Sequence, residues 1–160
     1  LIENKSIPEH KIGMLGNSMG AGTAAITFGQ DTRIHAVALD SGYLNLDEIV
    51  EEELARENYP TWLFGGALFS AWMFGGETLL EPSPTSAFEN AGQRPILIIH
   101  GTTDDRVDVH HSEDMLVLAE ELDVNATAWI VEDAGHVESQ LLHPEEYELR
   151  IVSFFDSALA

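Results

Sequence analysis

The chain has 160 residues and a strongly acidic composition: lysine and arginine number 7 against 28 aspartates and glutamates, for a formal net charge of −21. A surface of this sign repels phosphate backbones and anionic lipids, so we do not expect nucleic acid as a partner. The absence of cysteine excludes disulfides, thiolate metal sites and a cysteine nucleophile, and leaves the cellular compartment open. The hydrophobic fraction of 44% supplies enough apolar material for one packed domain.

Segments typical of strands and helices alternate along the first half of the sequence. Residues 11–15 are a short apolar run that predicts a strand, and residues 19–28 follow with the apolar spacing of a helix. Residues 34–39 predict a buried strand, and residues 47–57 predict an acidic helix. The segment 59–76 comes next and is rich in tryptophan, phenylalanine and glycine.

The second half continues the alternation. Residues 95–100 form the clearest strand, a continuous apolar run typical of a strand covered on both faces. Residues 112–122 predict a helix with Ser112 as its N-cap, residues 126–131 a strand, and residues 144–158 a final helix. Strands that alternate with helices predict an α/β fold, with a mostly parallel sheet flanked by helices on both faces.

A serine flanked by glycines lies between the first strand and the first helix. The run Gly16-Asn17-Ser18-Met19-Gly20 matches the pattern G-x-S-x-G, which between a strand and a helix projects the serine hydroxyl clear of the sheet. Glycines let strand and helix pass closely, and we expect side chains at positions 16 and 20 to collide. The helix N-terminus favours an anion beside Ser18, and the Met19 backbone N–H is the expected oxyanion donor. The alternative is a glycine-rich turn with an incidental serine.

Two later segments supply what a reactive serine needs. A serine hydroxyl is a weak nucleophile, so an imidazole must take its proton, and a carboxylate must orient that imidazole. Asp104 follows the strand 95–100, and His136 follows the strand 126–131. Open α/β sheets gather their sites at the carboxyl ends of the strands, where both residues and Ser18 are expected.

Together these segments resemble the α/β-hydrolase superfamily of serine hydrolases, whose order along the chain is serine, acid, histidine. Residues 100–107 are similar to the family's His-Gly-x-x-Asp-x-x-Val segment, and residues 133–136 to its Gly-His segment. The resemblance is to small esterases and to the prolyl-oligopeptidase-like and dienelactone-hydrolase-like branches. It implies a small ester or peptide substrate, no cofactor, and a catalytic triad of Ser18, Asp104 and His136.

Two other aspartates compete with Asp104 for the role of the acid. Asp105 is adjacent, but the spacing of the family segment selects position 104. Asp40 ends the strand 34–39, and some family members carry their acid after that strand.

The remaining histidines suggest structural roles. His110 and His111 are adjacent, so their side chains should point in different directions, and no metal-ligand spacing involves them. His100 is expected to fix its own loop by hydrogen bonds. We therefore expect no metal site.

The aromatic segment 59–76 lies where the resembled family often inserts a lid. Its large side chains are candidates for an acyl or aromatic pocket, chiefly Trp62, Phe69 and Trp72. The alternative is plain core packing of a short helix. The apolar stretch 61–76 is shorter than the roughly 20 residues that a transmembrane helix needs, so no membrane span is expected.

The family's sheet normally has several strands before the elbow, and only a short stretch precedes it here. We expect the chain to be the C-terminal part of an α/β-hydrolase domain, with the second oxyanion donor in a preceding part. Alone it would expose a sheet edge and be poorly soluble or inactive.

The leading functional hypothesis is hydrolysis of a carboxylic ester or related acyl bond through an acyl-enzyme on Ser18. A peptidase or aminopeptidase with the same triad is one alternative. A binding protein of the same fold without catalytic activity is another, and the oligomeric state stays open.

Overall fold

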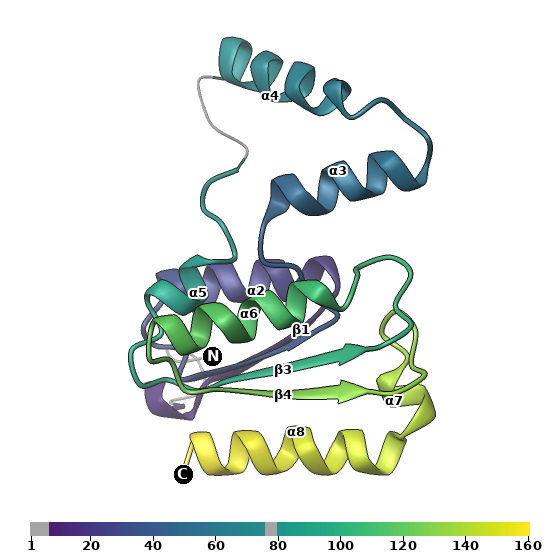
Figure 1. Ribbon diagram of the computed structural model, residues 1–160. Coiled ribbons are helices and arrows are strands. Elements are labelled where there is room, and N and C mark those ends of the chain that lie inside the picture. Colours follow the sequence, from purple (N-terminus) through teal and green to yellow (C-terminus); the bar gives the residue numbers. More distant parts are fainter. Residues whose placement is uncertain (1–6, 76–79) are drawn as a thin grey trace.

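The computed structural model describes residues 7–75 and 80–160, in which a single four-stranded sheet forms the centre (Figure 1). The strands lie side by side in chain order: β1 (Gly13–Asn17), β2 (Ala36–Asp40), β3 (Ile96–Gly101) and β4 (Ala126–Val131). Each neighbouring pair is parallel, with Leu15 opposite Ala38 and Ala38 opposite Leu97. The parallel sheet predicted from the sequence is confirmed.

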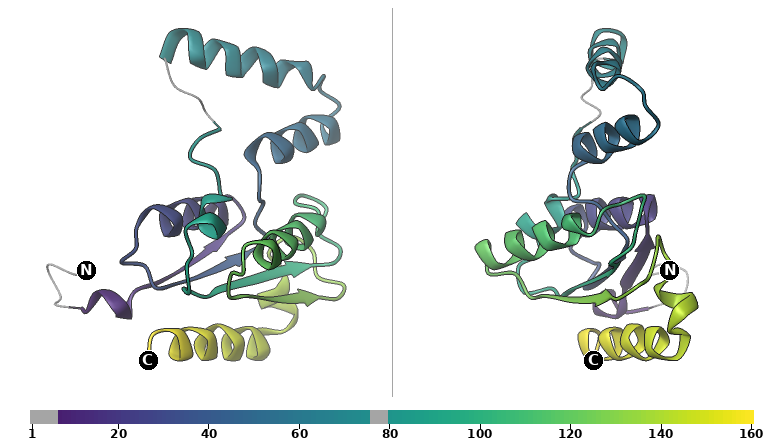
Figure 2. Two further views of the ribbon diagram at one scale, coloured as in Figure 1. Left: turned by 60° about the vertical axis from the view of Figure 1, so that its left-hand side comes forward. Right: turned by 45° about the vertical axis from the view of Figure 1, so that its right-hand side comes forward.

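Helices cover both faces of this sheet, as Figures 1 and 2 show. One face carries α2 (Met19–Gln30), α5 (Ser86–Glu89) and α6 (His110–Glu121). The other face carries α8 (Pro144–Ala158), which follows the short α7 (Ser139–Leu142). A 3₁₀ turn, η1 (Glu9–Lys11), precedes β1.

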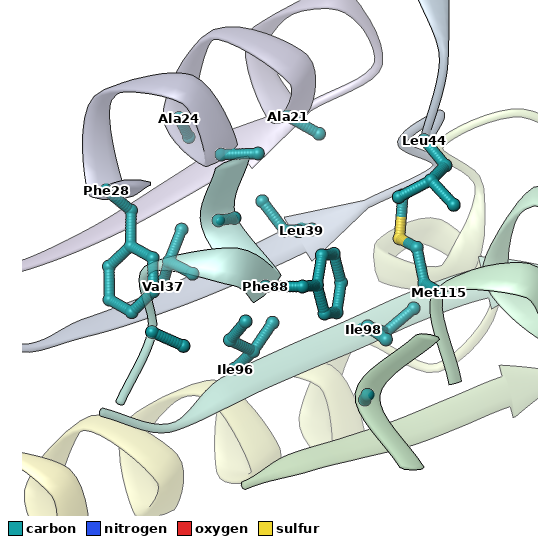
Figure 3. Close-up of a cluster of buried hydrophobic side chains, with 14 of the residues drawn as sticks. Ala21, Ala24, Phe28, Val37, Leu39, Leu44, Phe88, Ile96, Ile98 and Met115 are labelled. Carbon is teal, nitrogen blue, oxygen red and sulfur yellow. The ribbon is translucent and has the colours of Figure 1, made fainter. Parts of the chain in front are cut away.

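The two faces bury separate apolar clusters because successive strand residues point to opposite sides. In β2, Val37 and Leu39 face the cluster under α2, whereas Ala38 faces the cluster under α8. Figure 3 shows Phe88 of α5 among the side chains of the first cluster, and Phe88 is 1% exposed. Burial on both faces explains why the inner strands are continuous apolar runs rather than alternating ones.

Between β2 and β3 the chain leaves this body to form two further helices. α3 (Leu46–Arg56) and α4 (Trp62–Gly75) stand beyond the layer of α2 and α6, and α4 is the farther from the sheet (Figures 1 and 2). Helices in the described ranges lack the combination of length and apolar character that crossing a membrane requires.

The start of α6 differs from the prediction. The helix begins at His110, so Ser112 lies inside it and is not its N-cap. The Ser112 hydroxyl instead lies 2.5 Å from His100 Nδ1, and the other ring nitrogen of His100 lies 2.8 Å from the Val107 carbonyl oxygen. The side chain that local sequence assigns to a cap is used here to join α6 to β3.

Gly16 is the point where β1 and α2 approach most closely. A Cβ atom on Gly16 would lie 2.2 Å from the carbonyl oxygen of Gly20 and 2.8 Å from Ala21 Cα, so one backbone would have to move. The collision expected at position 20 is absent, since a Cβ on Gly20 has no atom of the described residues within 4 Å. Only the first glycine of the pattern is required by packing.

Alanine at these two glycines should therefore have opposite effects on stability. We expect Gly16→Ala to lower the free energy of unfolding of the full-length protein by about 1–3 kcal/mol, the range of overpacked sites. Gly20→Ala, in the first turn of α2, should leave it unchanged or raise it by up to about 1 kcal/mol. Urea denaturation followed by circular dichroism measures both, and equal midpoints would contradict the close contact at Gly16.

Candidate active site

Ser18 lies at the sharp turn from β1 into α2. Its backbone has φ 54° and ψ −125°, in the positive-φ region that residues other than glycine rarely adopt. The Ser18 N–H donates to the Asp40 carbonyl oxygen at 2.8 Å, and the Ser18 carbonyl accepts from the Ala21 N–H at 2.8 Å. Hydrogen bonds on both sides hold the strained residue in place.

His136 and Asp104 reach Ser18 from the loops that follow β4 and β3. His136 Nε2 lies 2.8 Å from Ser18 Oγ, and His136 Nδ1 lies 2.8 Å from Asp104 Oδ2 and 3.1 Å from Oδ1. The tautomer with a proton on Nδ1 donates to the carboxylate and leaves Nε2 free to accept the serine proton. The structure thus brings together the three residues that the sequence singles out.

The surroundings of Asp104 keep its carboxyl group ionised. Burial by itself raises the pKa of Asp104, but His100, the Val107 N–H and His136 outweigh it and hold that pKa well below its usual range. The Val107 N–H donates to Oδ1 at 2.9 Å, and His100 Nε2 lies 3.4 Å from Oδ2. A carboxylate that stays charged can orient the His136 ring and stabilise its protonated form.

The two rival aspartates lie in other environments. Asp40 is fully buried and accepts a hydrogen bond from the Tyr147 hydroxyl at 2.9 Å. Burial raises the pKa of Asp40 above its ordinary value despite that hydrogen bond. Asp105 is exposed on the loop after β3. The carboxylate hydrogen-bonded to His136 is that of Asp104.

The loop that carries His136 is fixed by residues that the sequence did not single out. Val137, next to His136, has φ 58°, which is unfavourable for a β-branched residue. Its N–H donates to the hydroxyl of Ser41 at 3.1 Å, and Ser41 also has positive φ. No sequence pattern marks this pair, because the two residues lie far apart in the chain and meet only in the fold.

Met19 is the first residue of α2. Its N–H therefore has no carbonyl acceptor within the helix, and the helix N-terminus carries partial positive charge. The Met19 side chain is 75% exposed. A role for this N–H as the oxyanion donor beside Ser18 stays a prediction.

An apolar cavity of about 330 Å³ opens beside Ser18 and His136. Its far wall comes from α3, through Leu46, Ile49, Val50 and Glu53. These four residues were not predicted as pocket residues because the helix was interpreted only as acidic. Their spacing of i, i+3, i+4 and i+7 is typical of one helix face, and this was the signal that could have identified the wall.

Two of the three predicted pocket residues of the aromatic segment do not line this cavity. Trp62 is 73% exposed and Phe69 is 56% exposed, and neither lines the cavity. The side chain of Trp72 lies outside the described residues. A role for these three residues in substrate binding stays a prediction.

Comparisons with known proteins agree with this architecture. The uncharacterised protein YqkD of Bacillus subtilis is 29% identical over 161 residues, which cover 98% of this chain and 52% of the relative. Esterase Pf2001 of Pyrococcus furiosus superposes with a TM-score of 0.68 and 22% identity, over 93% of this chain and 54% of the esterase. The chain therefore spans about half the length of these proteins.

A larger protein contains the same fold. A puromycin-hydrolysing peptidase of Mycobacterium tuberculosis superposes with a TM-score of 0.71 and 17% identity, over 99% of this chain and 24% of the peptidase. At these identities the structural similarity establishes the fold alone. It confirms the α/β-hydrolase fold predicted from the sequence. The sequence model of the prolyl oligopeptidase family matches residues 1–160. Because this match extends over every residue, the chain belongs to the prolyl oligopeptidase family.

Proposed function

We propose that the protein is a serine hydrolase that cleaves a carboxylic ester or a related acyl bond through an acyl-enzyme on Ser18. The observation that carries the proposal is the continuous relay from Ser18 Oγ to His136 and from His136 to Asp104, with both hydrogen bonds 2.8 Å long. Membership of a family of hydrolases supports the same reaction class.

The relay performs the two halves of acyl transfer in sequence. His136 takes the Ser18 proton through Nε2 as Oγ attacks the carbonyl carbon, and Asp104 stabilises the resulting imidazolium. The Met19 N–H stabilises the negative charge on the substrate oxygen. His136 then gives its proton to the leaving group, and in the second half it takes a proton from the attacking water and returns it to Ser18 Oγ as the acyl group is released.

The rest of the domain is proposed to lie in sequence outside these 160 residues. Within the described residues β1 pairs on one side only, with β2, and its Leu15 is 43% exposed. The relatives above are about twice as long as this chain. Further strands would pair with β1, cover its apolar residues and contribute the second oxyanion donor.

A peptidase is the second candidate, and two observations favour it. The family is that of prolyl oligopeptidase, and the carboxylate of Glu53 lines the cavity beside Ser18 together with apolar residues and Arg106. Glu53 contacts Arg106 at 3.8 Å and also pairs with Arg56, so much of its charge is balanced within the protein. This balance leaves ester cleavage as the first choice. Rates of hydrolysis of two substrates that share one acyl group, one with an ester bond and one with an amide bond, distinguish an esterase from a peptidase.

Labelling with a fluorophosphonate tests the proposal on the full-length protein. The reagent reacts with serines activated by a neighbouring base, so peptide mapping by mass spectrometry should place one adduct on Ser18. Heat-denatured protein is the control and should take no label, because the relay is then dispersed. A folded protein that stays unlabelled would favour the alternative of a binding protein.

A further inference from the structure

A second group of ligating side chains lies between α3 and the first turn of α6. Glu48, His110 and His111 each offer a donor atom, and the three atoms lie within 4.8 Å of one another. His110 Nε2 is 3.6 Å from Glu48 Oε1, and His111 Nδ1 is 3.9 Å from Glu48 Oε2. Two ligands of one tetrahedral zinc ion lie about 3.4 Å apart, so small side-chain movements bring these atoms to ligand spacing.

The two histidine rings do not diverge as expected. Their centroids are 4.3 Å apart and the ring planes meet at 29°, in a stacked arrangement. Successive helical residues are separated by about 100° around the axis. Both rings nevertheless turn toward the carboxylates of α3, because His110 lies 3.4 Å and His111 lies 3.2 Å from Glu52 oxygens. The expectation that the two side chains point in different directions was wrong here.

A buried nitrogen of His111 is the independent sign of a ligand. His111 is fully buried, and its Nδ1 has no hydrogen-bond partner in the described part of the chain. Leaving such a group unsatisfied is unfavourable, because it loses its hydrogen bonds to water on burial. The other ring nitrogen, Nε2, lies 3.2 Å from Glu52 Oε2. With the proton on Nε2, the Nδ1 lone pair is free on the side of Glu48.

His110 has the same arrangement with its nitrogens exchanged. Its Nδ1 lies 3.1 Å from Asp108 Oδ1, and its Nε2 is the nitrogen near Glu48. Histidines that bind metals almost always donate their second N–H to a carboxylate or carbonyl, which fixes the tautomer and turns the lone pair to the ion. Glu52 supplies such a carboxylate to His111, and Asp108 supplies one to His110.

We propose that Glu48, His110 and His111 bind a divalent transition-metal ion of the zinc class, with Glu52 and Asp108 orienting the two histidines. Imidazole nitrogens and a carboxylate oxygen are ligands that Zn²⁺ accepts at about 2.0–2.2 Å, and three carboxylates offset the charge of the ion. A cavity of about 250 Å³, whose lining includes Glu52, Asp108 and His110, lies beside this cluster. Sequence spacing missed the site because its ligands come from two separate segments.

The role assigned to this ion is structural. It would join α3 to α6, and α3 also carries the wall of the apolar cavity beside Ser18. The ion would therefore hold that wall against the body of the molecule without touching the reacting atoms. Binding should slow hydrogen exchange in the α3 peptide.

Zinc titration of the metal-free full-length protein tests the site. Calorimetry at weakly alkaline pH, where protons compete least for imidazole, should find one tight Zn²⁺ site per chain. Glu48→Gln should weaken its affinity by about 100-fold or more, and Asp108→Asn by about 10-fold or more. Glu51→Gln is the matched control, because Glu51 is an exposed acid on the same helix and its loss should leave the affinity unchanged.

Two further measurements make the outcome decisive. Co²⁺ in place of Zn²⁺ should give the visible absorption of a tetrahedral ion in the wild type and lose it in Glu48→Gln, whose folding is checked by circular dichroism. Slowed exchange in the α3 peptide on adding Zn²⁺ should vanish in the same variant. Absence of tight binding in the wild type overturns the proposal. Equal weakening by Glu48→Gln and Glu51→Gln overturns it too, since it would reflect general electrostatic attraction.

Discussion

Replacing Ser18 with alanine is expected to lower kcat of the full-length protein on an activated ester by about a millionfold. The substitution removes the only atom that the relay activates, because His136 Nε2 lies 2.8 Å from Ser18 Oγ. Binding of the acyl group should persist, since the apolar wall of α3 is untouched. Hydrolysis of a p-nitrophenyl ester, with kcat and KM measured separately, checks this expectation.

A second serine gives the matched control for that experiment. Ser86 carries a buried hydroxyl that has no hydrogen-bond partner among the described residues, and it lies beside Gly29 of α2. Ser86→Ala removes the same atom without unpairing another group, so both activity and folding should be retained. If Ser18→Ala kept more than about one hundredth of the activity, a nucleophile other than Ser18 would have to be sought.

Local patterns predicted the part of the site that lies at strand ends. The elbow around Ser18 and the loops of Asp104 and His136 each follow a buried strand, and a parallel sheet necessarily brings such positions to one edge. The close approach of Gly16 to α2 and the positive φ of Ser18 lie within the same short segment. In these places short-range sequence and topology are enough.

The parts that were missed depend on how one helix lies against another. The face of α3 that lines the cavity and the acids of α3 that meet His110 and His111 are both set by the position of α3 over α6. Nothing in a single segment encodes that position. The same is true of Ser112, whose hydroxyl is used by His100 on the neighbouring strand. Tertiary contacts decided each of these cases over local preference.

The substitution Asp104→Asn is expected to lower kcat by about 10⁴-fold while leaving KM little changed. The new side chain would present an amide in place of the carboxylate that accepts from His136 Nδ1 at 2.8 Å, and this favours the wrong tautomer of the ring. Asp105→Asn is the adjacent control and should retain activity, because Asp105 is exposed. Loss of activity in Asp105→Asn but not in Asp104→Asn would reverse the assignment of the acid.

The pH dependence of stability separates Asp104 from Asp40. The pKa of Asp104 lies below the unfolded value of about 3.9, so its ionised form stabilises the folded state above that pH, and the stabilisation is lost as pH falls toward the folded pKa. The pKa of Asp40 is raised by burial, so the folded state loses stability as pH rises from about 3.9 through the folded pKa.

Urea denaturation between about pH 3 and pH 6 should therefore show the advantage of wild type over Asp104→Asn growing with pH. The advantage over Asp40→Asn should shrink over the same range, because asparagine can still accept the hydrogen bond from Tyr147 without becoming charged. Parallel slopes for the two variants would mean that the two carboxyl groups do not differ in their electrostatic surroundings, and the argument that Asp104 alone is held ionised beside His136 would fail.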